Sequence, residues 1–224
     1  MHIYIAGDST AANKSIDKKP ESGWGEYLPD FYKKMVNITN FALNGCSTKS
    51  FIDDGMLKKI EALLQNRDIV LIQFGHNDQK KEDPSRYADP IMFYANLKTF
   101  VDTIKNKNAI PILLTPITRR SFLNTHQIDK NTHGEYPGIV LEFARNHQVY
   151  CIDTFKLSQN YFESLGDEES KKYFLHLQSG ENDNYPNGIE DNSHFSEKGA
   201  KMMAQIITQE MLKLPLGLKL YINL

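Results

Sequence analysis

Short apolar segments alternate with longer amphipathic segments along most of the 224-residue chain, and this alternation restricts the fold more than any other feature. The apolar segments are rich in Ile, Val, Leu and aromatic residues and lack a clean polar alternation. Such a composition is typical of strands that are buried on both faces of a parallel sheet. We expect strands at residues 3–6, 36–41, 69–74, 110–115 and 149–152.

The amphipathic segments between these strands carry apolar residues at helical spacing. We expect helices at residues 25–34, 51–65, 90–107, 136–146 and 196–213, with Ser196 as the N-cap of the last one. Alternating strands and helices favour right-handed crossovers, with helices on both faces of the sheet. The predicted fold class is therefore α/β, a three-layer α/β/α sandwich around a five-stranded parallel flavodoxin-like sheet.

The charge balance and composition exclude several classes of protein and partner. The 26 Lys and Arg residues face 28 Asp and Glu residues, which leaves no basic excess for a nucleic acid or an anionic membrane. No apolar run approaches the roughly 18 residues of a membrane span. Two Cys residues predict no disulfide framework. No G-x-G-x-x-G, Walker A, HExxH or CxxC pattern occurs, so we expect neither a cofactor nor a metal ion.

The chain shows no repeat, linker or low-complexity tract, so we expect a single domain over residues 1–213. The apolar tail at residues 214–224 is expected either to pack back on this domain or to pair with another subunit in an oligomer. The N-terminus enters the first strand without a signal-peptide pattern, which favours a cytoplasmic protein. A secreted protein whose signal had been removed would begin in the same way.

Polar residues follow the expected strands, at the edge of a parallel sheet where ligands bind. Ser9 is a candidate nucleophile there, although a turn or N-cap serine is the alternative, and its hydroxyl needs a base. Asp191 and His194 supply one, because the Asp can hold Nδ1 of the His and turn Nε2 toward the serine. The alternative for this pair is a solvated Asp and His in the loop that enters the last helix. Gly45 and Asn77 can donate to a developing oxyanion, or they are simply a turn glycine and a loop asparagine.

Taken together, these segments resemble the SGNH (GDSL-like) hydrolase family, whose sequence blocks stand here in the family order. Within that family the chain is similar to the rhamnogalacturonan acetylesterase group, from residue 3 to about residue 212. The blocks are Gly7-Asp8-Ser9, Gly45, Gly75-x-Asn77-Asp78 and Asp191-x-x-His194, and the similarity within the group extends to Gly23-Trp24-Gly25, Thr115-Pro116 and His133-Gly134-x-Tyr136-Pro137.

The resemblance implies a role for each block. Ser9 would be the nucleophile, His194 the general base and acid, and Asp191 its orienting partner. The oxyanion hole would consist of the backbone N–H groups of Ser9 and Gly45 and the side chain of Asn77.

One position departs from the pattern of the group. Members of the group often have an Arg after the glycine of the second block, whereas this chain has Cys46. A backbone donor at Gly45 survives that change, and we expect the Cys46 thiol to be inert.

Three further residues are candidates for substrate binding. Arg119, with Arg120 beside it, follows the fourth strand and can pair with a galacturonate carboxylate, although a solvated or structurally paired Arg is the alternative. Trp24 can stack on a sugar or pack at a helix entry. His76 is a candidate as well, with loop ordering as its alternative role. Polar segments expected to form rim loops that determine substrate choice lie at residues 80–89, 119–131 and 178–192.

The resemblance implies a serine esterase that removes acetyl groups from a pectin-type carbohydrate through a triad and an acyl-enzyme. Another acylated sugar, a lipid or a thioester is an alternative within the same chemistry. A non-catalytic carbohydrate-binding module is an alternative from a different class, but it would need a broken triad. A flavodoxin-like nucleotide binder is disfavoured, because Asp8 would repel a phosphate.

Overall fold

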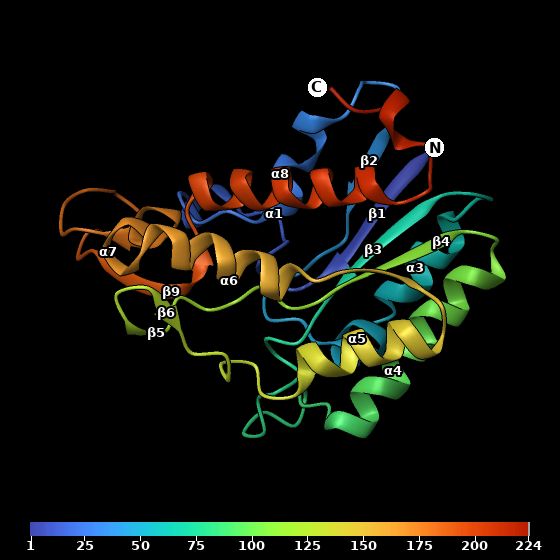
Figure 1. The fold of residues 1–224 in the computed structure, drawn as a ribbon, viewed down its shortest axis with the longest axis horizontal. Coiled ribbons are helices and arrows are strands. Elements are labelled where there is room, and N and C mark those ends of the chain that lie inside the picture. The colour runs from blue at the N-terminus through green and yellow to red at the C-terminus, as the bar shows by residue number, and fades with distance from the viewer. Residues whose placement is uncertain (224) are drawn as a thin grey trace.

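Five parallel strands form the central sheet, in the order β2-β1-β3-β4-β7 (Figure 1). The computed structural model describes residues 1–223. Each strand begins and ends within one residue of its expected position, and the order is that of a flavodoxin-like sheet. The predicted fold class is confirmed. The strands are β1 (His2–Gly7), β2 (Asn37–Asn40), β3 (Ile69–Gln73), β4 (Ile110–Leu114) and β7 (Tyr150–Ile152).

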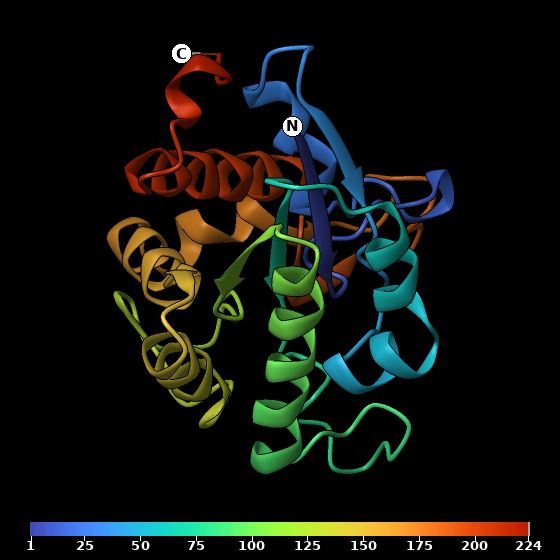
Figure 2. The same cartoon turned by 90° about the vertical axis from the view of Figure 1, so that its right-hand side faces the viewer.

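Helices cover both faces of this sheet (Figures 1 and 2). Side chains that alternate along a strand enter two different cores: Ile3 and Ile5 pack on one face, while Tyr4 and Ala6 pack on the other. The first core is covered by α1 (Trp24–Tyr27), α6 (Thr154–Leu165) and α8 (Glu197–Lys213). The second is covered by α2 (Thr48–Asp53), α3 (Met56–Leu63), α4 (Pro90–Asn106) and α5 (Tyr136–Asn146).

Two of the expected helices are shorter than predicted. The segment at residues 51–65 is split into α2 and α3, because Gly55 lies between them with a left-handed φ of 71°. The segment at residues 25–34 is α1 followed by a 3-10 helix, Leu28–Phe31, which contains Pro29. Proline has no N–H to donate, so α-helical hydrogen bonding cannot continue through it.

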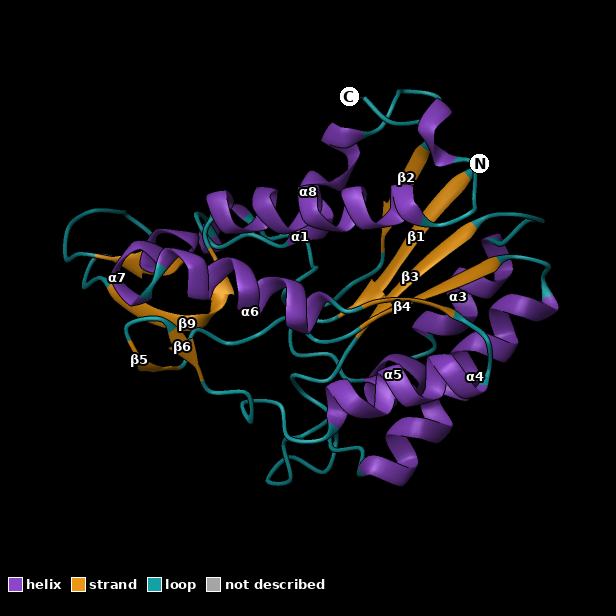
Figure 3. Ribbon diagram, in the orientation of Figure 1, coloured by secondary structure: helices purple, strands orange, loops and turns teal. Residues whose placement is uncertain are grey.

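Two β-hairpins, which the sequence analysis did not predict, lie beside the carboxyl end of the sheet (Figure 3). One pairs β8 (Phe174–Leu177) with β9 (Ile189–Phe195), and the other pairs β5 (Phe122–Asn124) with β6 (Gln127–Ile128). The segments at residues 119–131 and 178–192 are therefore not wholly loops. Asp191 and His194 lie in β9, so the alternative that placed a solvated pair in a helix-entry loop is wrong. Helices α6 and α7 (Asp167–Ser170) were also not predicted.

The C-terminal tail packs back on the domain over its described part. Leu218 and Ile222 are buried and belong to the same core as the apolar side chains of α8. Ile222 forms an antiparallel bridge with Tyr32, and the N–H of Lys33 donates to the carbonyl of Tyr221. A role of the tail in an oligomer stays a prediction. Within residues 1–223, no helix has both the length and the apolar character that a membrane crossing requires.

Candidate active site

Ser9, His194 and Asp191 form a continuous hydrogen-bonded chain, although Ser9 and His194 are 185 positions apart in the sequence. The Ser9 Oγ lies 3.0 Å from His194 Nε2, and His194 Nδ1 lies 2.7 Å from Asp191 Oδ2. When the Nδ1–H donates to Asp191, Nε2 presents its lone pair to the Ser9 hydroxyl. This is the geometry in which a histidine can remove the proton of a serine.

Asp191 is held in its ionised form by its surroundings. Its Oδ1 accepts the backbone N–H groups of Ser193 and His194 at 2.7 and 3.0 Å. Burial would raise the pKa of Asp191, but the hydrogen bond and charge of His194 and these two N–H groups outweigh it, and the pKa falls to about 2. Asp191 can therefore stabilise a positive charge on His194 without taking its proton.

Asp8 fixes the turn that presents Ser9 at the end of β1. The buried Asp8 carboxylate accepts the N–H and the hydroxyl of Thr10 at 2.9 and 2.8 Å. Its other oxygen lies 3.1 Å from Nδ1 of His76. Burial would raise the pKa of Asp8, but the charge of His76 and the hydrogen bonds from His76 and Thr10 lower it to about 2. A permanent carboxylate thus anchors the serine turn.

Lys14 connects the loop of Ser9 with the loop that follows β2. Its buried ammonium donates to the carbonyl oxygen of Ser9 at 2.7 Å and to Oδ1 of Asn44 at 2.5 Å, and it pairs with Glu21 at 2.7 Å. Because Asn44 precedes Gly45, this ammonium holds the two candidate backbone donors near each other.

Gly45 adopts a backbone conformation that favours glycine, with a φ of 73°. A Cβ atom there would also lie 3.1 Å from Nη1 of Arg86. The positive φ explains why the position favours glycine, and a side chain there would also press against Arg86.

Asn77 lies in the loop after β3, next to the loop of Gly45. Its side-chain amide donates to the carbonyl of Cys46 at 2.9 Å. An amide NH₂ carries two N–H groups, so this bond leaves one for a substrate. The following Asp78 is buried and accepts the N–H and hydroxyl of Thr48 at 2.8 and 2.5 Å and the N–H of Gly75 at 3.1 Å. Asp78 therefore ties the Asn77 loop to the start of α2.

The three residues predicted to bind substrate differ in their burial and in their hydrogen-bond partners. Trp24 has no exposed surface and donates from Nε1 to Gln73 at 2.6 Å, so its predicted stacking on a sugar is wrong. The buried side chain of His76 orders the Asp8 turn, as its alternative role proposed. Arg119 is only half-buried and donates from Nη1 to Ser193, next to the His194–Asp191 pair.

Arg120 and Cys46 are not placed to act on a substrate. Arg120 is buried and forms an ion pair with Asp167 and hydrogen bonds with Ser170 and Asn192, which is the structural alternative. Burial raises the pKa of the Cys46 thiol to about 11, so the thiol stays protonated. Among residues 1–223, no group of three or more His, Cys, Asp or Glu side chains is placed to hold a metal ion.

Sequence reasoning missed three residues that shape this site: Lys14, Asp78 and Arg86. Asp78 stands within one of the recognised blocks, and this position in the sequence could have identified it. Lys14 and Arg86 carry no such signal, because each acts through contacts with a loop that is distant in sequence.

Residues 5–202 match the model of the GDSL-like lipase/acylhydrolase family. The chain belongs to this family. It is a carboxylic ester hydrolase, and the resemblance that the motifs indicated is confirmed.

Two curated members of the family match this chain over nearly its whole length. Rhamnogalacturonan acetylesterase RhgT of Bacillus subtilis is 38% identical over 219 residues, which cover 98% of this chain and 93% of the relative. The probable rhamnogalacturonan acetylesterase YesY of the same organism is 32% identical, with 97% of this chain and 95% of the relative covered.

Solved structures of other hydrolases show the same fold. The crystal structure of the YxiM protein of Bacillus subtilis superposes with a TM-score of 0.81 at 27% identity, over 94% of this chain and 56% of that chain. A catalytic mutant of Axe2, an acetylxylan esterase from Geobacillus stearothermophilus, gives a TM-score of 0.66 at 15% identity, over 94% and 93% of the two chains. At that identity, the likeness to Axe2 concerns the fold alone.

Proposed function

We propose that this family member is a serine esterase that removes O-acetyl groups from a pectin-type carbohydrate, namely rhamnogalacturonan or its oligosaccharides. The observation that carries the chemistry is the hydrogen-bonded chain from Ser9 through His194 to Asp191. The substrate class is supported by two relatives, matched along almost their whole length, that are named rhamnogalacturonan acetylesterases.

In the first half of the proposed reaction, Ser9 Oγ attacks the acetyl carbonyl carbon while His194 Nε2 takes the hydroxyl proton. Asp191 keeps the imidazole oriented and stabilises the imidazolium. The carbonyl oxygen becomes an oxyanion that accepts hydrogen bonds from the backbone N–H groups of Ser9 and Gly45 and from the side chain of Asn77. His194 then protonates the leaving sugar oxygen, and an acetyl-Ser9 ester remains.

In the second half, His194 removes a proton from a water molecule, which attacks the acetyl-enzyme. The same three donors stabilise the second oxyanion. Collapse of this intermediate releases acetate, and the proton on His194 returns to Ser9. The cycle needs no metal or cofactor, since every proton is moved by His194.

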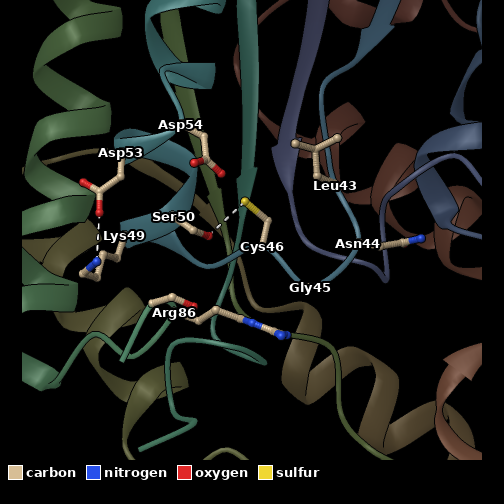
Figure 4. A pocket seen from close by; sticks show the side chains of 10 residues that line it. Leu43, Asn44, Gly45, Cys46, Lys49, Ser50, Asp53, Asp54 and Arg86 are labelled. Atoms are coloured by element: carbon tan, nitrogen blue, oxygen red, sulfur yellow. Dashed lines mark hydrogen bonds and ion pairs between the residues drawn. The ribbon is translucent and has the colours of Figure 1, made fainter. Parts of the chain in front are cut away.

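Polar surroundings favour a carbohydrate over a lipid. The cavity beside Gly45 contains charged side chains, including Lys49, Asp54 and Arg86 (Figure 4). A lipid acyl chain would leave these groups without water or partners, whereas sugar hydroxyls can bond to them. A carbohydrate-binding module without activity is disfavoured, since the Ser9–His194–Asp191 chain is unbroken.

The test is acetate release from a panel of esters. It should include acetylated rhamnogalacturonan oligosaccharides, acetylated xylo-oligosaccharides, a long-chain p-nitrophenyl ester and an acetyl thioester. We expect the highest kcat/KM on the rhamnogalacturonan oligosaccharides and none in Ser9→Ala. Ser164→Ala, which removes an exposed hydroxyl from α6, is the matched control and should retain activity. A preference for the long-chain ester or the thioester would contradict the proposed substrate.

A further inference from the structure

A cavity of about 520 Å³ adjoins Gly45. Its wall consists of the loop after β2, the exposed side of α2 and the loop that precedes α4. Figure 4 shows Arg86, from that last loop, extending toward Gly45, with Lys49, Asp53 and Asp54 on the side of α2. This cavity therefore continues directly from one of the candidate oxyanion donors.

One edge of the Arg86 guanidinium is held by an acidic side chain, and the other edge lies at Gly45. Its Nε lies 2.7 Å from Asp83 Oδ2. Asp83 is itself held by the N–H and hydroxyl of Ser85, at 3.1 and 2.5 Å from Oδ1. Within residues 1–223, Asp83 is the ion-pair partner that the structure gives Arg86, and it engages only Nε. Nη1 lies at Gly45, 3.1 Å from where a Cβ would stand.

Arg86 is the cationic side chain of the cavity that lies at Gly45. Lys49 pairs with Asp53 at 2.9 Å on the same helix and lies farther from Gly45 (Figure 4). Asp54 lies on that side as well and would repel an anion. The cavity thus has a cationic side chain at Gly45 and acidic side chains at α2 and its C-cap. A ligand with one carboxylate and several hydroxyls matches this arrangement, because its carboxylate can bind Arg86 and its hydroxyls can donate to the acidic side chains.

We propose that Arg86 binds the carboxylate of a uronic acid that is the acetylated sugar itself or adjoins it, and that this cavity is the corresponding sugar subsite. The proposal rests on the proposed function, because it names the charged group that selects the substrate of the same site. The adjacency of Arg86 and Gly45 requires the carboxylate to lie close to the ester. The guanidinium is pre-positioned by Asp83, so little side-chain mobility is lost on binding.

Arg119 flanks the site on the opposite side and is the other arginine that a carboxylate could approach. It already donates to Ser193 and faces the carboxylates of Asp8 and Asp191, which would repel a third carboxylate. Arg86 faces no catalytic carboxylate at Gly45. The structure therefore assigns selection for the negative charge to Arg86.

The experiment compares two substrates that differ only in charge. One is an acetylated galacturonate-containing oligosaccharide, and the other is the same oligosaccharide with its carboxyl groups reduced to alcohols. For Arg86→Gln, we expect the ratio of kcat/KM on the charged substrate to that on the reduced one to fall about 10- to 100-fold, through KM. The wild-type ratio should also fall as salt is added, because the pair is partly exposed.

Matched variants separate this proposal from a general loss of charge or of folding. Arg145→Gln removes an exposed arginine at the end of α5, at the opposite edge of the sheet, and should leave the ratio unchanged. Arg86→Lys keeps the charge without the guanidinium fork and should give an intermediate ratio. The Arg86 side chain is 37% exposed, so its removal should shift the thermal unfolding temperature little.

Two outcomes would overturn the proposal in distinguishable ways. Equal losses on the charged and reduced substrates in Arg86→Gln, or a fall of the ratio in Arg119→Gln alone, would reject Arg86 while the acetylesterase function stands. Failure of the wild-type enzyme to release acetate from any carbohydrate, with p-nitrophenyl acetate still hydrolysed, would reject the proposed function and with it the subsite.

Discussion

The two sides of Ser9 are built from different parts of the fold. The proposed oxyanion side, which contains Gly45 and Asn77, comes from loops that follow strands of the central sheet. The proposed base side, which contains Asp191 and His194, comes from β9, a strand outside that sheet. Asn77 is 3% exposed, whereas the side chain of His194 is 33% exposed.

This difference follows from what each side must do. Donors to an oxyanion act best when they are fixed before the reaction, and burial among hydrogen bonds such as those of Asp78 fixes them. The base must exchange protons with a leaving alcohol and with water, so it needs partial exposure. The fold thus provides a rigid donor side and a wetter proton-transfer side, and Ser9 belongs to both.

The largest effect is expected where the two sides meet. Ser9→Ala should lower kcat/KM about 10⁶-fold, and His194→Ala should do nearly the same, because the pair acts as a unit. The double variant should lose no more than either single one. Acetate release and thermal unfolding measure this. Retained turnover in Ser9→Ala, with the fold intact, would reject the triad.

A smaller loss is expected within the base side. Asp191→Asn should lower kcat about 10⁴-fold, since an amide no longer fixes the tautomer that presents Nε2 to Ser9. The variant should still bind substrate, which can be measured by calorimetry in the Ser9→Ala background. A loss below tenfold would show that the backbone around His194 orients the ring without Asp191.

On the oxyanion side, Asn77→Ala should lower kcat about 10²- to 10³-fold and leave KM nearly unchanged. The reason is that its donor is needed chiefly when the oxyanion forms. Steady-state kinetics on an acetylated oligosaccharide separate the two constants. An unchanged kcat would remove Asn77 from the oxyanion hole. Combined with Asp191→Asn, the losses should multiply, because the residues serve different sides.

The smallest effect concerns the Asp8 turn under acid. The folded-state pKa of about 2 lies below the ordinary value of 3.8, so the Asp8 carboxylate stabilises the fold above pH 4. That contribution, about 2 kcal/mol by linkage, is lost as the pH falls from about 4 to about 2. The stability difference between wild type and Asp8→Asn should therefore shrink across this range. Urea unfolding at pH 6, 4 and 3 measures it, and a constant difference would contradict the assignment.

How far the sequence predicts each side depends on the range of the contacts. The oxyanion side could be located because apolar strands are visible in a sequence and their polar successors meet at one edge of a parallel sheet. The pairing of Asp191 with His194 could also be predicted from their spacing. The strand that carries them could not be predicted, because β8 and β9 are short, half-exposed and joined by a polar connection. The choice between stacking and packing for Trp24 could not be made from the sequence, since its buried partner, Gln73, is 49 positions away.

The 185-residue separation of Ser9 and His194 has a consequence for the synthesis and folding of the chain. During synthesis the proposed nucleophile is made 185 residues before its proposed base, so a nascent chain would carry an unactivated serine until β9 has been made. Joining such distant segments is among the slower events of folding. If Ser9 and His194 act as proposed, the appearance of esterase activity during refolding measures when β1 and β9 have come together.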